Sequence, residues 1–144
     1  MTSWQDPESV RFMLDDCKTW AIVGLSGDPT RTAYSIAALL QGRGKRIVPI
    51  HPNASQEDGL SVLDEQGYPT LADVPFPIDV VDVFRRSEFA GEFADQAVAI
   101  GARAVWFQLG VIDPAAFERT IAAGVPMVMD TCPAIEWRRH PLGS

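Results

Sequence analysis

The sequence predicts a single α/β domain over residues 1–144, a Rossmann-like three-layer sandwich in which helices cover both faces of a mainly parallel, five-stranded sheet. Two observations lead to this prediction. Short apolar runs alternate along the chain with helical segments of about a dozen residues, which is typical of βαβ units and parallel strands. The chain is also long enough for one full core, and no linker divides it.

The first expected helix begins at Asp6-Pro7, with the aspartate as cap and the proline in the first turn. Its apolar side chains recur at the spacing of one helix face, so the helix should pack on the sheet as a lid. These side chains are Val10, Met13, Leu14 and Cys17.

A βαβ unit is expected next. The strand 20–24 leads into a glycine-containing turn, and an apolar helix follows over 33–41. Gly42 and Gly44 end that helix, and 46–50 is the second strand.

The segment 54–77 is rich in turn-forming residues and is expected to be irregular. We expect a short helix near Ser61, with Leu71 and Val74 anchored in the core.

Three more strands are predicted in the second half of the chain, at 79–84, 104–108 and 126–129. A helix over about 87–100 separates the first two. A second helix, capped by aspartate and proline, covers about 113–124 and leads into the last strand.

Composition excludes several classes of protein. The net charge of −7 opposes non-specific binding to nucleic acids and to anionic membranes. The longest apolar stretches, 104–112 and 120–129, are shorter than the roughly 20 residues of a membrane helix. No basic and then apolar leader follows Met1, so a cytoplasmic location is expected. Cys17 and Cys132 are too few for a disulfide framework and lack metal-site spacing, so we expect reduced thiols and no metal site.

Ligands bind such sheets beyond the carboxyl ends of the strands, where the strand order reverses. The turn 24–31 combines glycine, serine, proline and arginine, so its backbone N–H groups could converge on an anion at the start of the next helix. An ordinary strand-to-helix turn is the alternative, and Arg31 favours the anion. The G-x-G-x-x-G fingerprint is absent, and the second strand ends in 51–53, His-Pro-Asn, rather than an acidic residue, which disfavours NAD.

Other strand ends carry further candidates. Arg85 and Arg86 could carry the charge of a phosphate while Phe84 packs on an adenine, although two solvated surface arginines are the alternative. Gln108 and Gly110 are placed for a ligand's amides. Neither a Ser-His-Asp set, a pair of glycosidase carboxylates nor a P-loop lysine can be assembled, so the chain predicts a binding site more clearly than a reaction.

With these residues assembled, the chain resembles the small stand-alone CoA-binding proteins, whose fold also forms the nucleotide-binding domain of succinyl-CoA synthetase alpha subunits. The resemblance covers about residues 10–139. Its motifs are Val23-Gly-Leu-Ser, Pro29-Thr-Arg, Ile47 to Asn53, Val80 to Arg86, Ala104 to Gly110, Val128 to Cys132 and Ile135-Glu.

The resemblance implies coenzyme A as the ligand. It places the turn 24–31 on the pyrophosphate, 51–53 and 84–85 around the adenosine, and 108–110 along the pantetheine. Cys132 would lie near the thiol end of CoA, where a mixed disulfide and an inert buried thiol are the alternatives. The implied binding residues are Gly24, Leu25, Ser26, Gly27, Pro29, Arg31, His51, Pro52, Asn53, Phe84, Arg85, Gln108, Gly110 and Cys132.

The chain departs from the family pattern at three places. First, His51-Pro52 stands where the family usually has Asn-Pro. Second, Thr131 stands where the family has arginine and Ala134 replaces the basic residue that often follows, so two cations near the expected site are missing. Third, Thr32-Ala follows Arg31 in place of Pro-Ser.

The leading hypothesis is a non-catalytic protein that binds CoA or acyl-CoA. One alternative is a subunit of an acyl-CoA ligase whose partner supplies the catalytic histidine, and another is an NAD-binding regulatory domain. The expected partner is a small molecule, with neither nucleic acid nor membrane involved, and a homodimer or a ligase partner subunit stays open.

Overall fold

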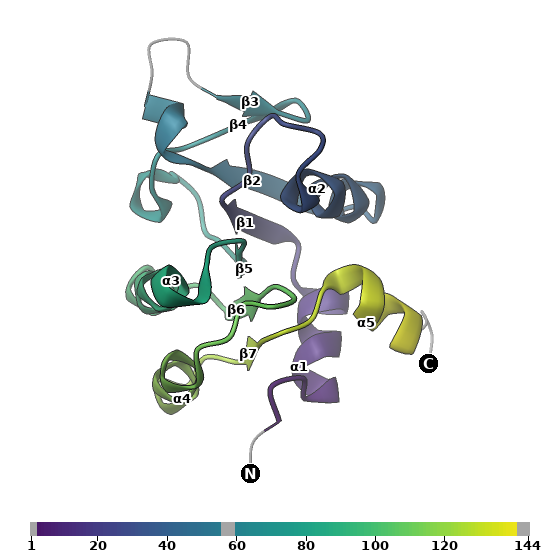
Figure 1. Ribbon diagram of the computed structural model, residues 1–144, viewed down its shortest axis with the longest axis vertical. Coiled ribbons are helices and arrows are strands. Elements are labelled where there is room, and N and C mark those ends of the chain that lie inside the picture. The colour runs from purple at the N-terminus through teal and green to yellow at the C-terminus, as the bar shows by residue number, and fades with distance from the viewer. Residues whose placement is uncertain (1–2, 56–59, 141–144) are drawn as a thin grey trace.

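The computed structural model describes residues 3–55 and 60–140. Its centre is a five-stranded sheet in which every neighbouring pair of strands is parallel (Figure 1). In space the strands follow the order β2 (Arg46–Ile50), β1 (Thr19–Val23), β5 (Val80–Val83), β6 (Ala104–Phe107) and β7 (Met127–Val128). The predicted Rossmann-like α/β fold is therefore confirmed.

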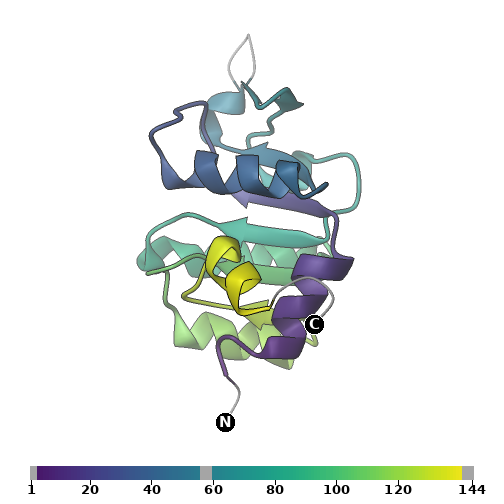
Figure 2. The same ribbon diagram turned by 90° about the vertical axis from the view of Figure 1, so that its right-hand side faces the viewer.

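Helices cover both faces of this sheet (Figures 1 and 2). One face carries α3 (Ser87–Ala99) and α4 (Pro114–Ala122). The opposite face carries α1 (Pro7–Arg11), α2 (Thr32–Gly42) and α5 (Pro133–Arg139). The result is the three-layer arrangement that alternating strands and helices predict.

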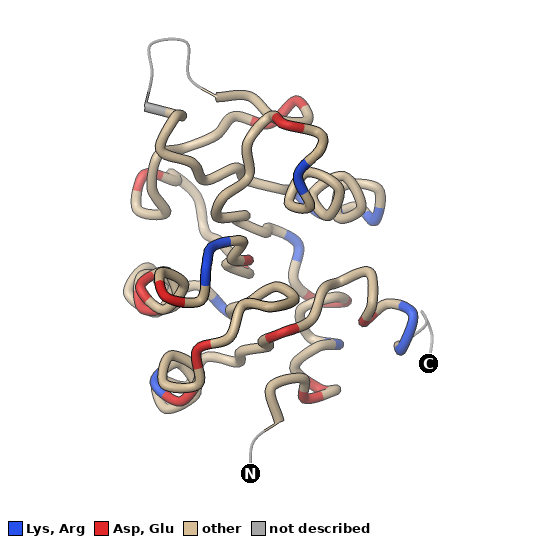
Figure 3. The backbone as a smooth tube through the Cα atoms, viewed as in Figure 1, with Lys and Arg blue, Asp and Glu red and all other residues tan. Residues whose placement is uncertain are grey.

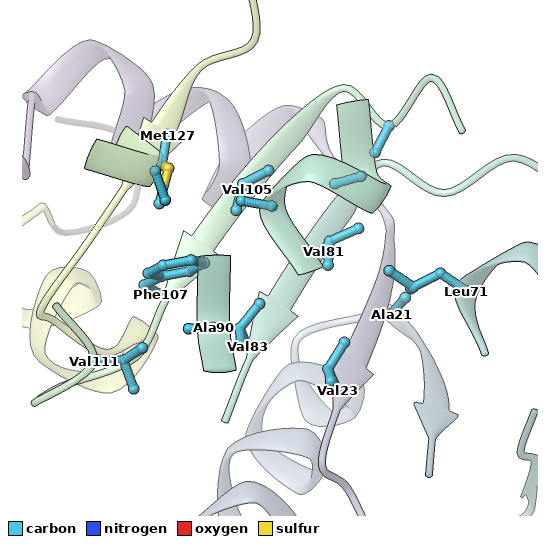
Figure 4. Close-up of a cluster of buried hydrophobic side chains, with 14 of the residues drawn as sticks. Ala21, Val23, Leu71, Val81, Val83, Ala90, Val105, Phe107, Val111 and Met127 are labelled. Carbon is cyan, nitrogen blue, oxygen red and sulfur yellow. The ribbon is translucent and has the colours of Figure 1, made fainter. Parts of the chain in front are cut away.

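The two cores follow from the alternation of side chains along each strand. In β1, Ala21 and Val23 face α3 and α4, whereas Trp20 and Ile22 face the other helices. All four are buried, as expected for a parallel strand covered on both sides. Figure 4 shows part of the core beneath α3, with Phe107 among its labelled side chains.

The N-terminal helix forms as predicted. The Asp6 carboxylate accepts a hydrogen bond from the Ser9 backbone N–H at 3.0 Å, and Pro7 occupies the first turn. One turn of π-helix over Phe12–Asp16 continues it. Its apolar face is buried in the same core as Trp20, so it packs on the sheet as expected.

The prediction of a short helix near Ser61 is wrong. The structure instead has a two-stranded antiparallel hairpin of β3 (Ser61–Val62) and β4 (Glu65–Gln66). Its turn residues Leu63 and Asp64 both have positive φ, at 52° and 64°. Two-residue hairpin turns with this geometry usually contain Asn-Gly or Asp-Gly. The sequence Leu63-Asp64 gives no such signal, and the hairpin could not be predicted from it.

Two short 3₁₀ helices complete the middle of the chain, Pro52–Ser55 and Leu71–Asp73. Leu71 is buried and Val74 packs on the same core, as predicted.

The last helix, α5, was not predicted. Pro133 occupies its first turn, and Arg138 and Arg139 lie in its last turn. Its buried Glu136 accepts hydrogen bonds from the Thr131 hydroxyl at 2.5 Å and from Arg139 at 3.1 Å. These bonds fix the helix immediately after the end of β7.

Candidate functional site

Two adjoining cavities open at the carboxyl ends of the strands. The first, here called the polar cavity, has a volume of about 260 Å³, and the second, the apolar cavity, about 330 Å³. Thr32 and Phe84 line both. The polar cavity is also lined by Gly24, Ser26, Arg31, Ala33 and His51, and the apolar cavity by Arg85, Gln108, Leu109, Val111 and Cys132.

The cavities lie where the strand order reverses. The chain passes from β1 outward to β2, then returns to place β5 on the other side of β1. Gly24 follows β1 and Phe84 follows β5, so both residues stand at this reversal. Open parallel sheets bind their ligands in the crevice that such a reversal creates.

Gly24 allows the close approach of β1 and β5. Its φ is +96°, and a Cβ built on it would lie 2.8 Å from the Phe84 carbonyl oxygen. Its N–H donates to the Ile50 carbonyl at 2.9 Å, which ties the turn to the end of β2 as well. A side chain at this position would therefore collide with the wall of the polar cavity.

The start of α2 faces the polar cavity. Arg31 is the residue before the helix and its side chain makes no capping hydrogen bond, while Thr32 and Ala33 line the cavity. The first N–H groups of a helix lack intrahelical partners, and the helix dipole adds partial positive charge there. With the Arg31 guanidinium, this end of α2 can bind an anion.

The turn before α2 is held by Asp28. Its carboxylate accepts hydrogen bonds from the Thr30 N–H at 2.9 Å and from the Thr30 hydroxyl at 2.7 Å. These bonds, aided by the charge of Arg31, lower the pKa of Asp28. Asp28 therefore stays ionised and orders the turn that presents Arg31.

Arg85 brings further positive charge to the site, and His51 contributes a neutral imidazole. Partial burial, followed by the charge of Arg85, lowers the pKa of His51. The neutral imidazole accepts the Asn53 N–H at Nδ1, at 3.1 Å, so its proton is on Nε2. Figure 3 shows basic positions at the start of α2 and in the segment between β5 and α3.

Gln108 lines the apolar cavity and is hydrogen-bonded to a buried acidic residue. The side-chain Nε2 of Gln108 donates to Oδ1 of Asp82 at 2.6 Å. Asp82 is fully buried, and this burial raises its pKa to about 8 despite the hydrogen bond from Gln108. Sequence reasoning missed Asp82, although an aspartate between Val81 and Val83 in a strand buried on both faces is itself a signal.

Other predicted residues lie near the cavities without lining them. Leu25 is fully buried in the core, and Gly110 donates its N–H to the Asp130 carboxylate at 2.8 Å. Gly27 and Pro29 belong to the turn before α2, and Pro52 and Asn53 begin the 3₁₀ helix Pro52–Ser55. The cavity residues that sequence reasoning missed are Thr32, Ala33 and Val111, whereas Leu109 lies within the predicted range 108–110.

The two cysteines differ in their surroundings. Cys132 is half-buried and lines the apolar cavity, whereas Cys17 is fully buried. Burial, and then the nearby charge of Asp79, raises the pKa of Cys17 to about 11. Cys17 should therefore be inert to thiol reagents.

A first prediction follows for thiol labelling. One equivalent of a disulfide reagent should react in the native protein, at Cys132, and a second only after unfolding. Cys132→Ser should abolish the native reaction, and Cys17→Ser should leave it intact. A ligand that fills the apolar cavity should slow the labelling, as followed by absorbance and peptide mass spectrometry. Native labelling at Cys17 would contradict this assignment.

Within the described ranges, 3–55 and 60–140, no helix is both long and apolar enough to cross a membrane. Within the same ranges, no three His, Cys, Asp or Glu side chains converge as metal ligands would.

Comparison with known proteins gives three kinds of match. A family model described as a CoA binding domain matches residues 18–138. The uncharacterized protein YneT of Bacillus subtilis is 30% identical over 123 residues, covering 85% of this chain and 87% of YneT. A hypothetical protein from Pyrococcus horikoshii is 32% identical, with a TM-score of 0.82 over 92% of this chain and 90% of the other.

A larger enzyme contains the same fold. An acetyl-coenzyme A synthetase of Ca. Korarchaeum cryptofilum matches with a TM-score of 0.65 and 20% identity. The match covers 80% of this chain but 26% of the synthetase chain.

Proposed function

The chain belongs to the CoA binding domain family, and from that membership we propose that it binds CoA or an acyl-CoA and catalyses no reaction by itself. The observation that carries the proposal is the pair of adjoining cavities at the reversal of strand order. One end is polar and cationic, and the other is apolar. CoA has the same division between its phosphorylated nucleotide and its pantetheine arm.

The polar cavity suits the pyrophosphate. The N–H groups at the start of α2 and the Arg31 guanidinium supply donors and positive charge in one place. This local charge matters because the whole chain carries a net charge of −7, so long-range attraction does not favour an anionic ligand.

The adenosine end is assigned to His51, Phe84 and Arg85. Phe84 lines both cavities and offers an aromatic face to the base. His51 lines the polar cavity and Arg85 the apolar cavity, on either side of Phe84, and we assign both side chains to one phosphate of the ligand. Binding of that phosphate should raise the pKa of His51.

The pantetheine arm is assigned to the apolar cavity. Phe84, Leu109 and Val111 give this cavity apolar surface that the arm can contact, and Gln108 supplies a side-chain amide. Cys132 lies in the same cavity, at the end assigned to the thiol of CoA.

Calorimetry with CoA, acetyl-CoA and NAD tests the proposal directly. We expect CoA to bind and NAD not to bind. Thermal unfolding gives a second readout, since a ligand at about 100 times its Kd stabilises the native state by roughly 2.7 kcal/mol. Stabilisation by NAD with none by CoA would overturn the proposal.

A second prediction concerns Arg31. Arg31→Ala should weaken CoA binding about 10- to 100-fold, because a charged hydrogen bond contributes roughly 1.5–3 kcal/mol. The far-UV spectrum and the melting temperature should not change, since the Arg31 side chain caps no helix.

A matched control removes the same charge elsewhere. Lys18 lies immediately before β1, at the amino ends of the strands and therefore away from the cavities. The affinity of Lys18→Ala for CoA should stay within about twofold of wild type. Equal losses in the two variants would show that only net charge matters.

A third prediction concerns the 3′-phosphate. Wild type should bind CoA about tenfold more tightly than dephospho-CoA, in line with one charge-assisted contact. Arg85→Ala should remove most of this preference while binding dephospho-CoA normally. Calorimetry with both ligands measures the two ratios, and a preference that survives in Arg85→Ala would assign the phosphate to other residues.

The fold match to a synthetase supports a second candidate, a subunit of an acyl-CoA ligase. This chain spans about a quarter of the synthetase, so the remaining functions would come from a partner. Incubation with acetate, ATP and CoA in the presence of copurified proteins tests this candidate. Product formation that depends on this chain would support it over the non-catalytic reading.

A further inference from the structure

Asp82 is an acidic residue in the middle of an apolar sheet. In the register of the strands it lies between Ile22 of β1 and Trp106 of β6. Both neighbours are fully buried and belong to the core beneath α1, α2 and α5. Placing a carboxyl group there is unfavourable unless its polar atoms find partners.

The carboxyl group of Asp82 has a single partner among the described residues, the Gln108 side chain. Oδ1 accepts from Gln108 Nε2 at 2.6 Å, whereas Oδ2 is fully buried without a hydrogen bond. A buried oxygen in this state destabilises the fold. Among the described residues, the hydrogen bond from Gln108 is therefore the only one that offsets the cost of burying the Asp82 carboxyl group.

That bond decides which end of the Gln108 amide faces the cavity. Nε2 points inward to Asp82, so Oε1 is the other end of the amide. Within residues 3–55 and 60–140, Oε1 has no hydrogen-bond partner, yet Asp82 Oδ2 is the only fully buried side-chain oxygen or nitrogen there without one. Oε1 is therefore accessible, and Gln108 lines the apolar cavity.

We propose that Asp82 is a positioning residue that holds Gln108 with its carbonyl oxygen toward the apolar cavity, where that oxygen accepts a hydrogen bond from an amide N–H of the ligand. This inference rests on the proposed function, because CoA carries amides in its pantetheine arm. It adds a preference for ligands that donate an N–H at this point. An amide free to rotate would offer its own N–H as readily and would lose that preference.

The protonation of Asp82 is compatible with this role. Burial raises the pKa of Asp82 to about 8, so at pH 7 the group is mostly a neutral acid. With its proton on Oδ2, the neutral acid still presents the carbonyl oxygen Oδ1 to Gln108 Nε2, as the carboxylate does. An asparagine side chain offers the same acceptor, but it adds an N–H donor that can also pair with Gln108 Oε1.

Analogues of CoA test the proposal. In each analogue one of the pantetheine amide N–H groups is replaced by an ester oxygen, which keeps the shape and removes the donor. Wild type should bind one of them about tenfold more weakly than CoA, the loss expected for a hydrogen bond. Calorimetry at pH 7 with wild type, Asp82→Val, Asp82→Asn and Gln108→Met gives the comparison.

Asp82→Val removes the acceptor and should bind CoA and that analogue with equal affinity. Gln108→Met should behave in the same way, and Asp82→Asn, which can pair with either end of the Gln108 amide, should keep only part of the discrimination. A merely structural role would change stability but not this ratio. Discrimination that persists in Asp82→Val, or that is absent from wild type while CoA still binds, would overturn the inference and leave the proposed function standing. No binding of CoA by wild type would overturn both.

Discussion

When the pH is raised from 4 to 9, the free energy of unfolding of Asp82→Asn is expected to rise relative to that of wild type by on the order of 5 kcal/mol. The reason is the burial of Asp82, which raises its pKa from 3.8 to about 8 in the native protein. Asparagine keeps the size of the side chain and an acceptor for Gln108, but it has no proton to lose.

The direction follows from the protons bound by each state. Between pH of about 4 and about 8 the native carboxyl group keeps its proton, while the unfolded chain has released it. The free energy of unfolding then falls by about 1.4 kcal/mol for each unit of pH increase. Above about pH 8 both states are ionised, and this contribution stays constant at its lowest value.

Urea unfolding at several pH values measures this difference between wild type and Asp82→Asn. Asp95→Asn is a suitable control, because Asp95 is exposed and its ion pair with Arg119 is a surface contact. The control should follow wild type to within about 1 kcal/mol across the range. A constant difference between wild type and Asp82→Asn would mean that folding does not raise the pKa of Asp82.

Gly24→Ala is expected to destabilise the protein by about 2–5 kcal/mol. The new Cβ would lie 2.8 Å from the Phe84 carbonyl oxygen, which is backbone and cannot rotate away. The φ of +96° adds strain for any residue other than glycine. Relief requires β1 and β5 to move apart at the polar cavity, so CoA binding should be lost as well.

Gly27→Ala is the matched control in the same turn. No atom lies within 4 Å of a Cβ built at Gly27, and its φ is not in the left-handed region. Its stability should stay within about 1 kcal/mol of wild type. Thermal and urea unfolding of both variants give the comparison, and a small effect at Gly24 would show that the two strands separate easily at this point.

Most of the fold could be predicted because its signals are local. Asp6 with Pro7 marks a helix start, and the apolar run of β1 ends in glycine at the point where the chain must turn. The hairpin of β3 and β4 could not be predicted, because its left-handed turn is formed by Leu63 and Asp64. A tertiary contact holds Leu63 in place, because its carbonyl oxygen accepts a hydrogen bond from Gln41 Nε2 at 2.8 Å.

The candidate site could be predicted at the level of strand ends, because parallel strands bring their carboxyl ends to one edge. The direction of each side chain was not predictable in the same way. Within one turn, Leu25 points into the core while Ser26 lines the polar cavity. Asp82 was missed because its partner, Gln108, is 26 residues away and on another strand.

The reversal of strand order gives the cavities a mechanical role. Their residues up to His51 follow β1 and β2, whereas those from Phe84 onward follow β5, β6 and β7. In the sheet these two groups of strands meet only where β1 pairs with β5. A ligand that occupies both cavities contacts residues from both groups of strands. If β1 separates from β5, the ligand must therefore be released as well. Amide hydrogen exchange in β1 and β5 should therefore slow together when the ligand binds, and subglobal opening between these two strands should merge with global unfolding.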